Sequence, residues 1–353
     1  MIRHTPSASA PLRPPRPVLR RLLQMLTLAA TSVASTMLPF PAVAQAQIQA
    51  QAQAQWPTRP IKLIIPFQPG GAADQIGRYY AQQLGNALGQ PVVVDNKPGA
   101  GTAIAAEAAA HAVPDGYTLS LATTGQLTIL PNLNPKVRFD PIKDFIPVAV
   151  VASVPNVVAV HPKLGVRTLE ELLARARSEE GKLTYSSCGS GTLCHLSGEL
   201  LQSLTRTRLV HVPYKGSAPA VAAALGGEVY IAVDTLTILS PQIRAGKLQG
   251  LVLSSDRRSP LLPDVPDARE SGLPDFAAAG WFGIVLPAGA PRPVIDRLAR
   301  EIDTIAATSG TAEHFTSRGI TVERSTPDDF AKLIRADHAR WAAIIRDAKI
   351  QAE

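Results

Sequence analysis

Cysteine is scarce in this 353-residue chain, in which Cys188 and Cys194 are the only two. None lies near the end of the apolar run close to the amino terminus, so a lipid-anchored cysteine is not expected there. The seven histidines are scattered, and the clustered ligands of a metal site are therefore lacking. After that run, no segment is long and apolar enough to span a bilayer. These absences argue against a metal centre, and we expect no cofactor.

The amino terminus has the layout of a secretory signal peptide. Residues 1–21 carry five arginines and no acid, and the apolar run LLQMLTLAATSVASTMLPF follows. Ala42-Val43-Ala44 then forms a small-x-small cleavage site, so we assign residues 1–44 to a signal peptide and expect a periplasmic protein. An uncleaved membrane anchor is the alternative, which the polar residues inside the run disfavour. Arg20-Arg21 gives weak support for twin-arginine export.

Removal of the leader changes the meaning of the net charge. The whole chain has 35 basic and 28 acidic residues, a formal charge of +7. Five of the basic residues lie in the leader, which leaves 30 against 28, or +2. The basic balance is therefore mostly a targeting signal, and we expect no nucleic-acid partner.

Residues 45–55 read QAQIQAQAQAQ, a low-complexity polar tract that cannot build a core and is expected to be a flexible linker. About 300 residues then remain, a length that suits two lobes. Strand patterns alternate with helical patterns, which is typical of α/β folds with parallel sheets covered by helices. The strand patterns lie at residues 61–67, 91–96, 117–123, 154–162, 183–187, 210–214, 229–234, 248–255 and 281–287.

The order of these elements predicts a chain that crosses twice between two lobes. We expect the first lobe over residues 56–152, the second lobe over 153–250, and a return to the first lobe over 251–353. Two crossing segments would form a hinge, with a cleft between the lobes. In the returning part, two amphipathic helices carry apolar residues that we assign to the core. They are Ile295, Leu298, Ile302 and Ile305, then Phe330, Leu333, Ile334, Trp341, Ile344 and Ile345.

Two glycine-rich loops follow strands and precede helices. They are QPGGAAD (68–74) and CGSGTLCH (188–195). Such loops lie at the carboxyl ends of parallel strands, where glycine lets an anion approach the free N–H groups of the next helix. A turn with no ligand is the alternative for each loop, but the pair favours a carboxylate held from both sides. Neither loop has the spacing of a nucleotide site.

Several side chains in these loops are candidate ligand contacts. Asp74 either caps its helix or holds an amino group, and the cap is favoured. His195 donates either to the ligand or only to backbone, whereas Ser190 and Thr192 supply hydroxyl donors. Cys188 and Cys194 are close enough for a disulfide, but two residues near a helix start can also point apart. A thiol or serine hydrolase is a poor alternative, because no orienting acid and no Gly-x-Ser-x-Gly elbow is present.

From Trp56 to the carboxyl terminus the chain resembles the Bug family of solute-binding receptors of tripartite tricarboxylate transporters. The resemblance rests on several blocks in order, including RPIKLIIPFQPGGAAD, GQPVVVDNKPGAG, LTYSSCGSGTLCHLSGEL, HVPYKGSAPA and WFGIVLPAGAP. It implies a two-lobed periplasmic-binding-protein-like (type 2) fold and no enzymatic activity. It also implies a small carboxylate ligand (a dicarboxylate, an amino acid or an aromatic acid), membrane permease subunits as partners, and a monomer. A sensing receptor without transport remains the alternative.

The resemblance also implies ligand-contact residues. Lys215 could add charge, although a solvated surface lysine is as good an interpretation. GAGTAIA (99–105), Cys194 and Asp267 depart from the family pattern, which leaves the ligand open. The implied contacts are Phe67, Gly70, Gly71, Ala72 and Asp74 in the first loop, Gly189, Ser190, Gly191, Thr192 and His195 in the second, and Thr123, Thr124 and, more weakly, Asp234 at strand ends.

Overall fold

The computed structural model describes residues 56–277, 279–348 and 350, which form one unit of the chain. The expected signal peptide and linker lie outside the described residues. Within the part that is described, no helix has the length and apolarity needed to cross a membrane.

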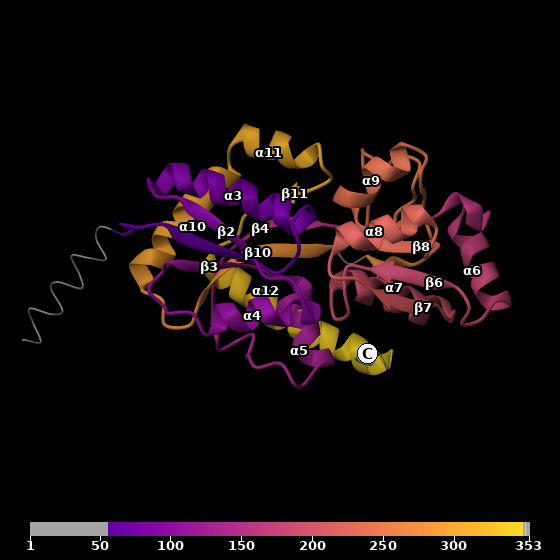
Figure 1. Cartoon of the computed structure of the whole chain (residues 1–353), viewed down its shortest axis with the longest axis horizontal. Helices are drawn as coiled ribbons and strands as arrows, with labels where there is room; N and C mark the ends of the chain where they lie inside the picture. The colour runs from indigo at the N-terminus through magenta and orange to yellow at the C-terminus, as the bar shows by residue number, and fades with distance from the viewer. Residues whose placement is uncertain (1–55, 278, 349, 351–353) are drawn as a thin grey trace, which may run out of the picture. The chain divides into compact units, whose positions relative to one another are not determined.

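The first lobe is built on a six-stranded sheet with the order β11-β4-β10-β3-β1-β2 (Figure 1). Its strands are β1 (Ile61–Ile65), β2 (Val92–Asn96), β3 (Thr118–Thr123), β4 (Phe145–Val154), β10 (Gly280–Pro287) and β11 (Thr321–Val322). Its helices are α3 (Ala72–Leu88), α4 (Ala103–Ala110), α5 (Leu130–Leu133), α10 (Arg292–Ala306), α11 (Ser309–Thr316) and α12 (Pro327–Asp347).

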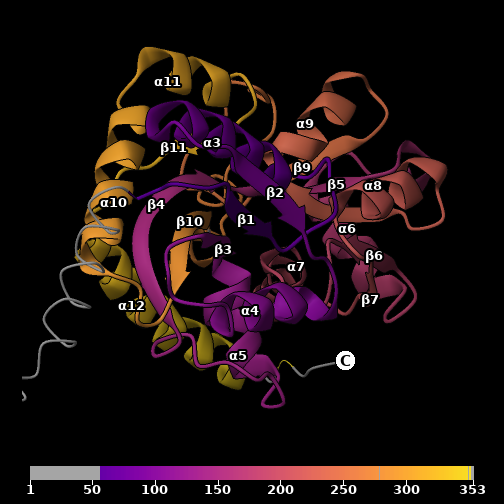
Figure 2. The same ribbon diagram turned by 60° about the vertical axis from the view of Figure 1, so that its left-hand side comes forward.

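Helices cover both faces of this sheet. Leu63 packs in a cluster with Tyr80 of α3 and Leu298 of α10. Its neighbour Ile64 packs in a different cluster, with Phe330 of α12. Successive strand residues point to opposite faces, so α3 and α10 lie on one side of the sheet and α12 on the other (Figure 2). A strand buried on both faces explains the apolar run of residues 63–65, whereas Lys62 near the start of the strand is exposed.

The second lobe is built on a five-stranded sheet with the order β7-β6-β8-β5-β9. Its strands are β5 (Asn156–Val160), β6 (Thr184–Ser187), β7 (Val210–Pro213), β8 (Ile231–Thr235) and β9 (Gln249–Leu253). Its helices are α6 (Leu169–Ser178), α7 (Leu193–Thr205), α8 (Ser217–Gly226) and α9 (Leu236–Arg244).

Both sheets are mixed, whereas the sequence predicted mainly parallel ones. Strands β1, β2 and β3 pair in parallel, but β10 is antiparallel to both β3 and β4. In the second sheet, β5 is antiparallel to β8 and β9. For β4 and β10 the reason is that β4 leaves the first lobe and leads through Pro155 into β5, while β10 comes back. Two strands that carry the chain in opposite directions between lobes must run antiparallel when they pair.

The return to the first lobe comes later than expected. A boundary at residue 250 falls inside β9, which pairs with β5 in the second sheet. Beyond β9, Ala268 and Phe276 still belong to the core of the second lobe. The chain therefore rejoins the first sheet only at β10, from Gly280. A strand at residues 248–255 was correctly predicted, but its sheet could not be read from its sequence.

The predicted helix starts and core positions are largely confirmed. Thr168 caps α6 through its Oγ1, and Thr326 caps α12 in the same way. In α10 all four predicted core residues are buried. In α12, Phe330, Ile334, Trp341 and Ile345 are buried, whereas Leu333 and Ile344 are only partly so.

Candidate ligand site

The first loop brings the start of α3 to the surface of a cavity. Residues 66–71 connect β1 to α3, and Gly70 has a positive φ of 97° that favours glycine. Gly71 precedes the helix without a side-chain cap. The first N–H groups of an α-helix have no partner within the helix, so an uncapped start can serve an anion.

The second loop presents the start of α7 in a similar way. Gly189 and Gly191 have φ values of 133° and 77°. Thr192 fixes the helix start, because its Oγ1 donates to the carbonyl of Gly189 at 2.6 Å and accepts from the N–H of His195 at 3.4 Å. Leu193 and Cys194 form the first turn behind it.

Two further helices begin at the same place, and the sequence reasoning missed them. Gly216, with φ 130°, precedes Ser217 at the start of α8. Thr235 lies at the end of β8 and precedes α9. Two dipeptides carried the signal that was missed, Gly216-Ser217 and Asp234-Thr235. Each lies between a strand and a helix and has a hydroxyl residue at the helix start.

The starts of all four helices line one small cavity of about 50 Å³ between the lobes. None of the residues that line it is charged, and Phe67, Trp281 and Phe282 form part of its wall. The arrangement can therefore attract an anion through backbone dipoles alone, inside an otherwise apolar cavity. The helix-start residues are Gly71, Ala72 and Ala73 of α3, Thr192, Leu193 and Cys194 of α7, Ser217 of α8 and Thr235 of α9.

A second cavity of about 370 Å³ shares Phe67, Cys188 and Thr192 with the first. On the first lobe its wall is residues 98–102, and on the second lobe it is residues 188–192 and 213–215. Lys215 is the one charged residue that lines it. The two cavities together give space for a polar group at the helix starts and for the remainder of a small molecule beside them.

The structure divides the residues implied by the resemblance into two groups. Those that line a cavity are Phe67, Gly71, Ala72, Thr123, Thr124, Gly189, Ser190, Gly191 and Thr192. Those that line neither cavity are Gly70, Asp74, His195 and Asp234. The hydroxyls of Thr123 and Thr124 already have protein partners, since they accept from the N–H groups of Gln126 and Trp281.

Asp74 braces the first loop. Its carboxylate accepts hydrogen bonds from Arg78, from the Asn96 amide and from the N–H of Gly70, so both oxygens are satisfied. Burial by itself would raise the pKa of Asp74, but these hydrogen bonds outweigh it and the pKa is lowered. This supports the structural interpretation of Asp74 over the holding of an amino group.

His195 braces the second loop from behind. Its Nδ1 accepts from the N–H of Gly191 at 3.2 Å, and its ring stacks on His211 with centroids 4.1 Å apart. Burial, with the nearby His211, lowers the pKa of His195 to about 3, so the ring is neutral. The sequence left open whether His195 contacts the ligand or only the backbone. The structure shows the backbone contact, in which the ring nitrogen accepts the hydrogen bond.

Asp234 is buried, with 1% of its surface exposed. Its Oδ1 accepts from Ser217 Oγ, from Thr235 Oγ1 and from the N–H of Thr235, whereas its Oδ2 has no partner among the described residues. Burial raises the pKa of Asp234 to about 6, against the lowering effect of those hydrogen bonds. Asp234 lies behind two residues that line the small cavity, Ser217 and Thr235.

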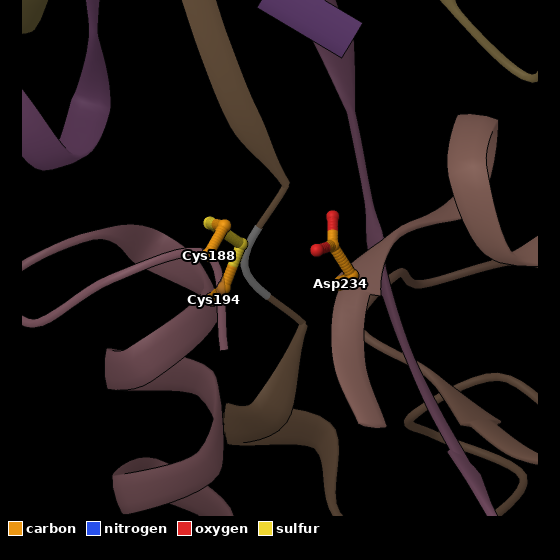
Figure 3. Close-up of side chains that lie close together, drawn as sticks. All are labelled: Cys188, Cys194 and Asp234. Carbon is orange, nitrogen blue, oxygen red and sulfur yellow. A yellow bond between two sulfur atoms is a disulfide. The ribbon is translucent and has the colours of Figure 1, made fainter. Parts of the chain in front are cut away.

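Cys188 and Cys194 are joined in a disulfide, with their Cα atoms 5.9 Å apart. One carboxylate oxygen of Asp234 and the two sulfur atoms lie within 4.8 Å of one another (Figure 3). Bonded to each other, the sulfurs cannot act as thiolate ligands of a metal or as a nucleophile. The cluster is therefore neither a metal site nor a thiol catalytic site in this form.

Comparison with known proteins decides the family. Residues 76–350 match the model of the tripartite tricarboxylate transporter family receptor. The chain is 36% identical over 293 residues to Protein BugT of Bordetella pertussis, which covers 83% of this chain and 90% of BugT. The chain belongs to this receptor family. Its members are solute-binding receptors and not enzymes, as the sequence predicted.

Two solved structures of similar proteins carry ligands. Rpa4515 of R. palustris, a structure with adipate, is 32% identical with a TM-score of 0.81, covering 84% of this chain and 99% of its own. MatC of Rhodopseudomonas palustris, with bound malate, is 31% identical with a TM-score of 0.79, covering 82% of this chain and 100% of its own. The periplasmic binding protein BugD is 30% identical with a TM-score of 0.81, covering 84% of this chain and 100% of its own, so the fold of this receptor is the two-lobed periplasmic-binding-protein fold.

Proposed function

We propose that this receptor captures a small carboxylate in the cleft between its lobes and delivers it to the permease of a tripartite tricarboxylate transporter. The convergence of four helix starts on one uncharged cavity carries the proposal, because their N–H groups and dipoles suit a carboxylate. The adipate and malate found in two similar proteins support the same ligand class.

Export to the periplasm belongs to the same proposal. The arginine-rich leader, its apolar run and the Ala42-Val43-Ala44 site support cleavage after residue 44. A ligand that contacts both lobes would favour the closed form, which the permease could then distinguish from the open form. We propose a monomer as the working unit.

A screen of acids against the purified receptor tests the ligand class. Mono-, di- and aromatic carboxylates are added in a thermal-unfolding assay, and each acid that stabilises is checked by calorimetry. A ligand at a hundred times its Kd should raise the free energy of unfolding by about 2.7 kcal/mol. The neutral amide of each acid is the control and should give no shift, because the helix starts attract charge.

Absence of any shift or heat, while circular dichroism shows a folded protein, would contradict the ligand proposal. Transport is tested separately, by uptake of the identified acid in a deletion strain. Normal uptake after deletion would mean that the receptor binds without delivering, as a sensing protein would.

A further inference from the structure

The disulfide lies in the wall of the ligand cleft and not inside a lobe core. Cys188 follows β6 and lines both cavities, while Cys194 is in the first turn of α7 and lines the smaller one. The link joins two residues that are six apart in the sequence, and the loop between them supplies Gly189, Ser190 and Thr192 to the cavities. Both cysteines are largely buried in this form, so a small molecule reaches the disulfide through the cleft once the lobes separate.

A buried acid stands beside the two sulfurs. Figure 3 shows the Asp234 side chain next to the disulfide, and one of its oxygens is within 4.8 Å of both sulfurs. Asp234 Oδ1 holds three donors, but Oδ2 has none. Asp74 offers the contrast, since both of its oxygens are satisfied. The unsatisfied oxygen of Asp234 is a place where a proton can be held.

The two sulfurs differ in their surroundings. Cys194 lies at the start of a helix of 13 residues, where the positive end of the helix stabilises a thiolate. Cys188 belongs to the wall of both cavities and is the less buried of the two, with 7% of its surface exposed against 3% for Cys194. Thiol–disulfide exchange is fastest when the attacked sulfur is accessible and the leaving sulfur is a stabilised thiolate. The pair has this asymmetry.

We propose that Cys188–Cys194 is a reversible thiol–disulfide exchange site in the cleft wall, and that the Asp234 carboxyl gives its proton to the leaving thiolate. The reductant is a dithiol or a pair of thiols. This activity goes beyond the proposed capture of a carboxylate and does not depend on it.

The exchange takes place in two steps. An incoming thiolate bonds to Cys188 Sγ, the bond between the two sulfurs breaks, and its electron pair leaves on Cys194 Sγ, which takes the proton of Asp234. A second thiolate then attacks the mixed disulfide and releases Cys188, which takes a proton from water, as Asp234 does. Two cysteines are reduced while the two reductant thiols are oxidised to a disulfide and give up their protons to water.

The test is the rate of reduction by dithiothreitol between pH 5 and pH 8. Reactions are quenched with acid, the freed thiols are alkylated and counted by mass spectrometry, and circular dichroism follows the fold. The rate constant is divided by the thiolate fraction of the reductant. For the native receptor this corrected constant should rise as pH falls through about 6, because Asp234 becomes protonated.

In Asp234→Asn the corrected rate constant should be about tenfold lower at pH 5 and no longer depend on pH, because the proton donor is gone. Asp267→Asn is the matched control: Asp267 is a buried acid of the same lobe that lines neither cavity, and its variant should keep the native profile. Ser217→Ala keeps the acid but removes a hydrogen bond to its charged form, so the midpoint of the profile should move to higher pH.

Three results would overturn the proposal. Reduction that occurs only together with loss of the circular-dichroism signal would make the disulfide a purely structural link. A native pH profile in Asp234→Asn would exclude the acid as proton donor. If Asp234→Asn fails to fold, an unshifted midpoint in Ser217→Ala excludes it instead.

Discussion

At the scale of single residues, Asp74 and Asp234 show how local partners decide the role of a buried acid. Asp74 lies in the first turn of α3 and Asp234 near the end of β8, and both were candidate ligand contacts. Three partners saturate Asp74 and lower its pKa, so it is fixed as a brace of its loop. Asp234 keeps one oxygen unsatisfied and a raised pKa, so folding leaves it poised to bind a proton.

Asp234 should make stability depend on pH in a definite direction. Its pKa in the folded protein is about 6, above the ordinary value of 3.8, so the folded state binds the proton more tightly. The free energy of unfolding should therefore fall as pH rises from about 4 to about 6, by about 3 kcal/mol in total. Urea unfolding of the native receptor and Asp234→Asn across this window measures the effect as the difference between the two.

His195 changes the pH dependence of the free energy of unfolding in the opposite direction, so its effect must be distinguished from that of Asp234. Folding lowers the pKa of His195 from 6.5 to about 3, so acidification below 6.5 removes stability as the unfolded chain takes up the proton. Asp234→Asn should then lose more stability than the native receptor between pH 6 and pH 4. A difference between the two proteins that stays constant over this range would contradict the role given to Asp234.

At the scale of elements, the site is a set of helix starts held by strand ends. Thr192 has two roles there, since its Oγ1 caps α7 and the residue lines both cavities. Thr168 has only the first role, because it caps α6 and lines neither cavity.

Thr192→Ala and Thr168→Ala separate capping from binding. Loss of either cap should lower the free energy of unfolding by about 1 kcal/mol. Only Thr192→Ala should also weaken binding of an acid found in the screen, by about tenfold, because the start of α7 then moves at the cavity. Chemical unfolding and calorimetry of the two variants give the two quantities, and equal affinities would remove α7 from the site.

The sequence predicts the helices and strands better than it predicts how they are arranged around the site. The loops before α3 and α7 were found because glycine stands between an apolar strand and an amphipathic helix. The starts of α8 and α9 were missed, because Ser217 and Thr235 become part of the site only when β6, β8 and β5 are neighbours in one sheet. The two roles of His195 stayed open for a related reason: its ring contacts Gly191 and His211, and the stacking on His211 depends on β7. The pairing of strands that are distant in the sequence places these residues, and the local sequence pattern does not predict that pairing.

At the scale of the whole receptor body, the lobes approach each other closely across the cleft. A Cβ added to Gly101 of the first lobe would lie 2.2 Å from the carbonyl oxygen of Ser190 in the second. The cavities of about 50 Å³ and 370 Å³ have walls from both lobes, so the binding space depends on this close approach.

Gly101→Ala should therefore keep the lobes from closing. Gly165→Ala is the control: both glycines have a positive φ, 60° and 71°, but the Cβ position at Gly165 has no neighbour within 4 Å. Each change should lower the free energy of unfolding by about 1 kcal/mol. Only Gly101→Ala should weaken acid binding and enlarge the radius of gyration in small-angle X-ray scattering. Equal behaviour of the two variants would show that this contact does not limit closure.

No charged residue lines the wall of the small cavity, so the affinity for a carboxylate there should depend little on dissolved salt. Dissolved ions screen exposed charges over about 10 Å at 0.1 M salt, but they screen enclosed dipoles much less. A carboxylate held by helix starts inside a closed cleft would keep its affinity when the medium changes from fresh to saline.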